Sequence, residues 1–378
     1  MPKRLTLRVA PIARAALLVS ALACSQATVP ATHVAATPAT SPPITHVDLS
    51  WLSITNVYFQ IGSLDVLLDG YITRIPESAF TDQGLIHSRY AVRPDSVAVA
   101  RVLTALGGPS SVNLLLSGHS HFDHSFDTAL WSRLTGARII GPRSTCYQAI
   151  AQQIEASRCA VVQGGEKFEL ADGVTLRVVR WNHSGDPAVN PVQHNPSELR
   201  AVPVRDSSTG GLHPGLGEDF PNGGGARAYL LTVRTPSRML SVFIQNTASP
   251  VDLHLPVVVD GVSYGAPLDN LRAAMRDAGL TSVDLWIATG GERVATLLLP
   301  VLAPKAYLPV HWDGQYSPFS SGVPAPFADN ALETQLGRAG VTLLRPVQYM
   351  DKWRLDATGV HAISNDAVKQ ALGFSTSP

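Results

Sequence analysis

One stretch constrains this chain more than any other. Residues 117–127 read SGHSHFDHSFD and directly follow the apolar run 112–116. Within six residues the stretch places four side chains that can bind metal: His119, His121, Asp123 and His124. Alternate side chains of an extended segment point to the same side, and a turn at Phe122 would bring the last two round to the opposite side of the same spot. Imidazole and carboxylate groups are ligands that Zn²⁺ accepts, so the stretch predicts a loop that serves one or two metal ions.

Three further residues follow strand-like segments in a fixed order along the chain. Asp69 ends an apolar strand upstream, His183 follows residues 174–181, and His311 follows residues 306–310. With the His-rich stretch, this order resembles the metallo-β-lactamase superfamily of metallohydrolases over about residues 48–355. The resemblance implies an α/β fold, an αββα sandwich of two mixed β-sheets with outer helices and a site at the strand ends.

The resemblance also implies a role for each candidate ligand. His119, His121 and His183 would hold one zinc ion, while Asp123, His124 and His311 would hold a second. Two such ions would generate a metal-activated hydroxide at neutral pH and polarise the bond to be cleaved. Asp123 and His311 are therefore the candidate catalytic residues, and no covalent intermediate on the protein is required.

Two acidic residues are expected to position ligands rather than to bind metal. In relatives the residue equivalent to Asp69 braces the metal loop. Asp313 follows His311 by two residues and is expected to orient its ring through a hydrogen bond. The pair Trp312-Asp313 resembles the branch of the superfamily that contains ascorbate-phosphate lactonase and N-acyl-phosphatidylethanolamine phospholipase D.

The chain departs from the family pattern at Asn246. Relatives carry there an aspartate that bridges both metals, whereas this chain reads Ile-Gln-Asn-Thr over residues 244–247. An amide offers one carbonyl oxygen and no charge to offset two dications. We expect Asn246 to be a weak ligand, the three-histidine site to fill tightly and the second site weakly. The alternatives are that Asp252 or Asp186 substitutes for the missing carboxylate, or that the strand alignment is shifted by several residues.

Residues 186–226 are rich in proline and glycine and have no regular period. A loop of this length inside a compact domain is usually functional. We expect it to wall the active site and to influence substrate choice. His194 and His213, which lie within it, either contact substrate or serve the structure.

The first 23 residues read as a secretory signal peptide, with basic residues followed by a short apolar run. Cys24 follows directly and is a candidate for lipidation, the alternative being simple cleavage. Residues 24–44, rich in Ala, Thr and Pro, are expected to form a disordered tether, and residues 45–378 a single hydrolase domain. We therefore expect an exported protein, periplasmic or lipid-anchored at the bacterial envelope.

Export would permit a disulfide between Cys146 and Cys159, which flank a helix-like stretch. The alternative is a pair of buried free thiols.

Charge disfavours nucleic acid as a partner. Lys and Arg together number 29, as do Asp and Glu, so the chain has no basic excess. The expected partner is a small-molecule substrate. Gly118-His119-Ser120 leads into the ligand cluster and not into the strand-turn-helix elbow of a serine hydrolase, and the sequence contains no glycine-rich nucleotide-binding motif.

Together these observations predict a zinc-dependent hydrolase of a small ester, lactone or phosphodiester. The alternative from another class is a non-catalytic, degenerate metal-binding protein of the same fold. Two further alternatives are an iron oxidoreductase, although no flavin-binding extension is present, and a β-lactamase, although those enzymes are shorter.

Period and turn residues predict the main elements. Helices are expected over residues 96–106, 126–134, 144–154, 267–278 and 327–338. Strands are expected over residues 50–60, 65–68, 112–116, 137–141, 159–162, 167–170, 174–180, 229–233, 239–245, 283–287, 306–310, 341–344 and 348–355.

Overall fold

The computed structural model describes residues 42–221 and 225–376. The expected signal peptide, Cys24 and most of the expected tether lie outside the described residues. Within the described ranges, no helix combines the length and apolar character needed to cross a membrane.

The first sheet contains eight strands in the order β19-β18-β1-β2-β3-β6-β7-β8. Its strands from β19 to β3 pair antiparallel, and those from β3 to β8 pair parallel. The bounds are β1 Val47–Ser53, β2 Asn56–Ile61, β3 Leu64–Leu68, β6 Leu114–Leu116, β7 Arg138–Gly141, β8 Cys159–Val161, β18 Asp351–Asp356 and β19 Gly359–Ile363.

The second sheet contains seven strands in the order β17-β16-β15-β12-β11-β10-β9. Here β17 to β12 pair parallel, and β12 to β9 pair antiparallel. The bounds are β9 Lys167–Ala171, β10 Val174–Arg180, β11 Arg227–Arg234, β12 Met239–Ile244, β15 Leu285–Ala288, β16 Ala306–Pro309 and β17 Thr342–Leu343. Two small hairpins complete the strands: β4 Phe80–Thr81 with β5 Gly84–Ser88, and β13 Val258–Val259 with β14 Val262–Ser263.

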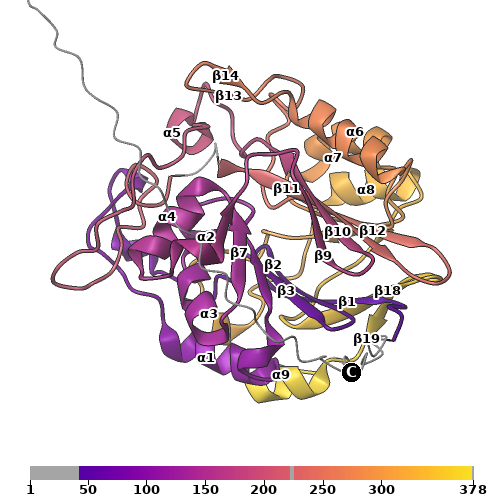
Figure 1. Ribbon diagram of the computed structural model, residues 1–378, viewed down its shortest axis with the longest axis horizontal. Helices are drawn as coiled ribbons and strands as arrows, with labels where there is room; N and C mark the ends of the chain where they lie inside the picture. Colours follow the sequence, from indigo (N-terminus) through magenta and orange to yellow (C-terminus); the bar gives the residue numbers. More distant parts are fainter. Residues whose placement is uncertain (1–41, 222–224, 377–378) are drawn as a thin grey trace, which may run out of the picture. The chain divides into compact units, whose positions relative to one another are not determined.

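Helices lie on the outer faces of the two sheets (Figure 1). Helices α3 and α4 pack on β6 to β8, with α1 and α9 beside them, and α6 packs on β10 and β11 with α7 and α8 on the same side. The bounds are α1 Ser96–Ala105, α2 Phe122–Ser125, α3 Thr128–Thr135, α4 Arg143–Ala151, α5 Pro191–His194, α6 Pro267–Ala278, α7 Gly291–Leu302, α8 Asn330–Arg338 and α9 Asp366–Leu372. The expected sandwich of two mixed sheets with outer helices is confirmed.

The second sheet is apolar on both faces, because successive side chains of its strands point to opposite sides. In β11, Leu231 faces the core between the sheets, while its neighbour Leu230 packs against the helices α6 to α8. Successive side chains of a strand point to opposite faces, so a strand buried on both faces must be apolar throughout. Residues 228–231 are all buried, as this arrangement requires.

Most of the predicted elements agree with the structure to within a few residues. Helix α1 begins where expected, because the Asp95 carboxylate accepts hydrogen bonds from the backbone N–H groups of Val97 and Ala98 at 2.9 and 3.0 Å. Four helices of the described residues were not predicted: the one-turn helices α2 and α5, and the longer α7 and α9. Helix α7 begins beside the paired glycines 290–291 and contains Pro300, so residues that usually interrupt helices obscured its apolar face.

Cys146 in α4 and Cys159 at the start of β8 form a disulfide. The same helix supports the His-rich stretch from behind, because Gln148 donates to the backbone oxygen of Ser120 at 3.0 Å and accepts from the Ser125 hydroxyl at 2.7 Å. The disulfide thus fixes a helix that holds the metal loop.

Removing this disulfide should lower stability. A bridge between residues 13 apart constrains the unfolded chain and contributes about 3 kcal/mol. We expect the double variant Cys146→Ser/Cys159→Ser to unfold at lower denaturant concentration by about that free energy, measured by urea unfolding with and without reductant. Reductant should lower the urea midpoint of the unmodified protein and leave that of the variant unchanged. Equal urea midpoints for the two proteins without reductant would contradict this prediction.

Candidate metal centre

The candidate ligands converge where strand ends of both sheets meet. The stretch after β6 of the first sheet supplies His119 and His121 and then enters α2, while His183 follows β10 and His311 follows β16 of the second sheet. They open into one cavity of about 160 Å³. Its lining residues are Leu85, His119, His121, Phe122, Asp123, His124, His183, Ser184, Gln193, Leu216, Asn246, Thr247, Thr289, His311 and Gln315.

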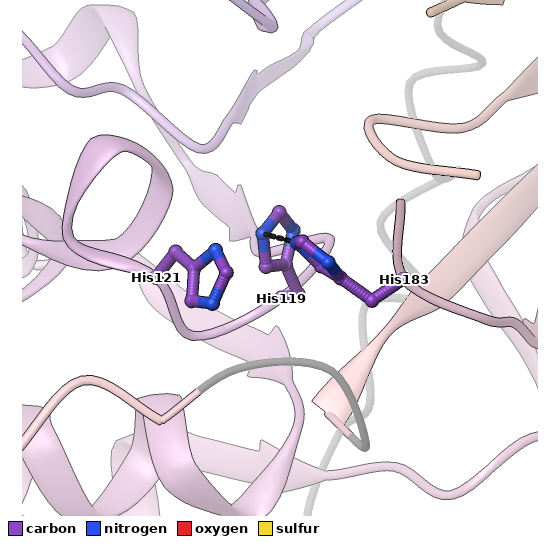
Figure 2. Close-up of side chains that lie close together, drawn as sticks. All are labelled: His119, His121 and His183. Carbon is purple, nitrogen blue, oxygen red and sulfur yellow. Dashed lines mark hydrogen bonds between the residues drawn. The ribbon is translucent and has the colours of Figure 1, made fainter. Parts of the chain in front are cut away.

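The first cluster consists of His119, His121 and His183, all of them buried (Figure 2). One nitrogen from each ring lies within 4.8 Å of the others. The Nε2 atoms of His119 and His183 are 3.2 Å apart. The sequence expectation that these three side chains face a common point agrees with their placement.

The second cluster consists of Asp123, His124 and His311. The Asp123 carboxylate lies 3.1 Å from His311 Nε2 and 3.5 Å from His124 Nε2. Asp123 and His124 lie in the one-turn helix α2 and not in an open loop, so the turn expected at Phe122 is helical. The rings of His119 and His124 are 3.9 Å apart between centroids, which makes the two clusters adjacent.

Burial holds the first cluster in the form that binds metal. It lowers the pKa of His119 and of His121 well below the usual value, and the neighbouring histidines add to the effect. Burial also lowers the pKa of His183 to about 3. The three imidazoles are therefore neutral at pH 7, and a neutral imidazole is the form with a lone pair to donate.

In the second cluster the charges of the partners dominate. Burial would raise the pKa of Asp123, but His124 and His311 outweigh it and lower that pKa. Burial would lower the pKa of His311, but its hydrogen bond to Asp123 outweighs it and raises that pKa. Asp123 is thus an ionised carboxylate that faces two imidazole rings.

The residues of the first cluster fit a zinc ion. Two nitrogens that each lie about 2.0–2.1 Å from one tetrahedral ion are about 3.3 Å apart, close to the spacing between His119 and His183. The Nε2 atom of His121 is buried and, among the described residues, has no hydrogen-bond partner. A buried polar atom without a partner is costly, and a metal ion would satisfy it.

Asp69 hydrogen-bonds to the backbone of the His-rich stretch and to one ligand of the second cluster. Its carboxylate is buried and accepts from Gly118 N at 2.8 Å, from the Thr55 hydroxyl at 2.5 Å and from His124 Nδ1 at 3.0 Å. Because the carboxylate only accepts, His124 must carry its proton on Nδ1, which leaves its Nε2 atom for metal. Thr55 was not predicted, since it lies in the turn between β1 and β2 and matches no motif.

Asn246 takes part in the same network. Its Nδ2 atom donates to Asp69 at 2.8 Å, so its Oδ1 atom faces His119 Nδ1 at 3.2 Å and must accept from it. This leaves His119 Nε2 for metal. A Cβ atom at Gly118 would lie 2.0 Å from Asn246 Nδ2, so only glycine fits there. The structure therefore places the Asn246 amide against Asp69 and His119, where it orients a ligand ring.

Asp313 was expected to hydrogen-bond to the His311 ring, but its carboxylate has other partners. Its carboxylate accepts from Ile54 N at 3.0 Å and from the Tyr349 hydroxyl at 2.8 Å. The carbonyl of Ile54 in turn accepts from His311 N at 2.9 Å. His311 has a φ of 65°, in the left-handed region that β-carbon residues avoid, and this backbone bond helps to hold it there. Asp313 thus acts on the backbone that holds His311 and not on the His311 ring. Sequence spacing alone could not distinguish these two roles.

Asp252 contacts the residue before His183 directly and the residue after it through His194. Its carboxylate accepts from Asn182 Nδ2 at 2.6 Å and lies 2.6 Å from His194 Nε2. The Ser184 carbonyl lies 2.9 Å from His183 Nδ1 and 3.4 Å from His194 Nδ1. Asp252 is therefore engaged beside the first cluster and does not replace the missing bridging carboxylate.

The Pro/Gly-rich segment does line the pocket, through Gln193 and Leu216. Neither of its histidines is among the described residues that line the cavity. His213 lies beside Asp219, 3.7 Å from its carboxylate, and His194 faces Asp252. Asp186, the other candidate substitute, accepts from Ala188 N within its own turn. The two histidines thus serve the structure of this segment.

No protein-family model matches the sequence, and no curated protein matches it. Several solved structures are similar. One is Igni18, a metallo hydrolase from the archaeon Ignicoccus hospitalis, with 14% identity and a TM-score of 0.46 over 82% of this chain and 99% of that chain. Another is an isothiocyanate hydrolase from Delia radicum gut bacteria, with 11% identity and a TM-score of 0.46 over 81% and 98%. A third is the metallo-β-lactamase fold protein YhfI from Bacillus subtilis, with 10% identity and a TM-score of 0.44 over 82% and 99%. All three are at most 14% identical to this chain.

Replacing Asp252 should loosen His183. In Asp252→Asn an amide faces two donors, Asn182 and His194, and can accept through only one of its two polar atoms. We expect roughly tenfold weaker zinc binding at the first cluster, measured by competition with a chromophoric chelator. Asp260→Asn is the matched control, because that carboxylate is exposed and pairs with Arg200 on the surface. Equal zinc affinity in the two variants would mean that Asp252 serves only the fold.

Proposed function

We propose that this protein is a metal-dependent hydrolase that uses zinc to cleave a small ester, lactone or phosphodiester. The observation that carries the proposal is the pair of adjacent three-residue clusters, His119–His121–His183 and Asp123–His124–His311, that open into one cavity. Nitrogen and oxygen donors of this kind suit zinc. The small cavity suits a small substrate or the reacting end of a larger one.

The residues around the clusters prepare them for metal. Asp69 holds a proton on Nδ1 of His124, and Asn246 accepts from Nδ1 of His119, so both Nε2 atoms keep their lone pairs. When bound, zinc supplies Lewis acidity and lowers the pKa of a water molecule to about 7. Phe122 and Leu216, both buried, limit the water that reaches the cavity.

The alternative, a metal-binding protein without turnover, is supported by Asn246. Its neutral amide stands where relatives carry a carboxylate, and of the six ligand side chains only Asp123 bears a negative charge. Zinc binding without metal-dependent turnover of any ester, lactone or phosphodiester would favour this alternative.

We also propose that the protein works outside the cytoplasm. The disulfide between Cys146 and Cys159 supports this, because disulfides persist in oxidising compartments. The signal-like residues 1–23 support it as well. Fractionation of cells that express the full chain, with and without Cys24→Ser, would separate a periplasmic protein from a lipid-anchored one.

Removing zinc should abolish turnover, and restoring it should recover turnover. We expect about one to two zinc ions per chain by elemental analysis, and loss of ester hydrolysis after chelation. His121→Ala should lose both activity and zinc at the first cluster, because it removes a ligand. His361→Ala is the matched control, since that histidine is exposed. A purified protein with no affinity for any transition metal would refute the proposal.

Zinc should bind in two steps of different affinity. We expect the first cluster to fill first, because the second would hold a dication close to the first while only one of the six ligand side chains, Asp123, carries a negative charge. Asn246→Asp should tighten the weaker step by roughly tenfold, and it should destabilise the metal-free protein because two carboxylates then meet at the 2.8 Å contact with Asp69.

The titration is followed by calorimetry on metal-free protein. Asn195→Asp is the control, because it adds the same charge at an exposed position of the neighbouring loop. Two equally tight sites in the unmodified protein would show that the lack of a second carboxylate does not weaken the second cluster.

A further inference from the structure

The cavity has a distinct apolar wall. Leu85 of β5, Phe122 of α2 and Leu216 of the Pro/Gly-rich segment all line it. Phe122 and Leu216 are buried, with 1% and 6% of their surface exposed, and Leu85 is half-buried. Three apolar side chains from three separate segments therefore meet beside the metal ligands.

This wall is held in place by its own contacts. Leu216 N donates to the Leu85 carbonyl at 2.7 Å, which joins segments 131 residues apart (216 − 85 = 131). The Phe122 ring lies 5.1 Å from the Phe80 ring and stacks on the Tyr316 ring at 6.2 Å between centroids. Phe122 and Phe80 belong to a buried apolar cluster against which Leu85 packs. The wall is thus a preformed surface and not a set of loose side chains.

The rest of the cavity lining is polar but uncharged. Apart from the six ligand residues and the apolar wall, the described lining side chains are hydroxyls and amides: Ser184, Gln193, Asn246, Thr247, Thr289 and Gln315. Groups of this kind donate to and accept from a carbonyl or ether oxygen. They do not supply a full positive charge to a carboxylate or phosphate.

We propose that the substrate is an uncharged carboxylic ester or lactone whose acyl part is apolar and lies against Leu85, Phe122 and Leu216. This rests on the proposed function. Removing an apolar chain from water against such a wall is favourable, by a factor of about four per methylene group. A charged group placed there would lose its hydration without gaining a partner, which is costly.

The reaction is a hydrolysis and needs only water as the second reactant. The water oxygen forms a bond to the acyl carbon, and the bond between that carbon and the ester oxygen breaks. The departing oxygen takes a proton from the water, so that the products are a carboxylic acid and an alcohol. The bonding electrons of the broken bond stay on the departing oxygen, and nothing is oxidised or reduced.

The test compares three substrates with the same leaving group on the zinc-loaded full chain. These are p-nitrophenyl butyrate, mono-p-nitrophenyl succinate, which has the same acyl length but ends in a carboxylate, and bis-p-nitrophenyl phosphate. After correction for spontaneous hydrolysis, we expect kcat/KM for the butyrate to exceed that for the succinate at least tenfold. Metal-dependent turnover that favours the succinate or the phosphate would overturn the inference and leave the proposed function intact. Turnover of none of the three would instead count against the proposed function.

A variant of the wall provides the second arm. Leu85→Lys places a cation at a half-buried position of the cavity, where the chain can accept it. We expect the ratio of kcat/KM for the succinate to kcat/KM for the butyrate to rise by roughly tenfold. Leu255→Lys is the control, because Leu255 is 51% exposed and does not line the cavity. An unchanged ratio in folded Leu85→Lys would show that the acyl group does not lie against this wall.

Discussion

The buried carboxylate of Asp69 is the interaction on which the metal centre depends. It receives hydrogen bonds from the β1–β2 turn, from the backbone at Gly118, from a ligand of the second cluster and from Asn246 after β12. A buried charge is tolerated only when donors surround it, and here the donors come from both sheets. Asp69 itself has a φ of 58°, so the backbone is bent out of its ordinary range to place this carboxylate.

The two clusters differ in how their surroundings prepare them. The first is neutral and enclosed, because burial lowers the pKa of each of its three imidazoles. The second contains a carboxylate and a histidine, His311, whose side chain is 28% exposed. The one negatively charged ligand, Asp123, and the most exposed ligand, His311, therefore both belong to the second cluster. That asymmetry follows from the elements that supply the ligands: the ends of β6 and β10 for the first cluster, and helix α2 and the end of β16 for the second.

The ligands of the site could be predicted from short sequence motifs, whereas the hydrogen bonds between residues distant in sequence could not. The stretch 117–127 and the positions of His183 and His311 after strands were enough to name six side chains that the fold gathers. The partners of Asp313 and Asp252 depend on contacts with residues far along the chain, which spacing does not reveal. Helix α7 was missed because Gly291 and Pro300 hide it, and the apolar wall because Leu85 and Leu216 look like ordinary loop residues.

Each cluster takes ligands that follow elements of both sheets, and this has a consequence for folding. His119 and His121 need His183, and Asp123 and His124 need His311, which lies 187 residues after His124 (311 − 124 = 187). Contacts this distant in sequence form late, after the loops between them have closed. A partly folded chain therefore presents at most two ligands of either cluster. Neither three-residue cluster is complete until strands of the two sheets have come together.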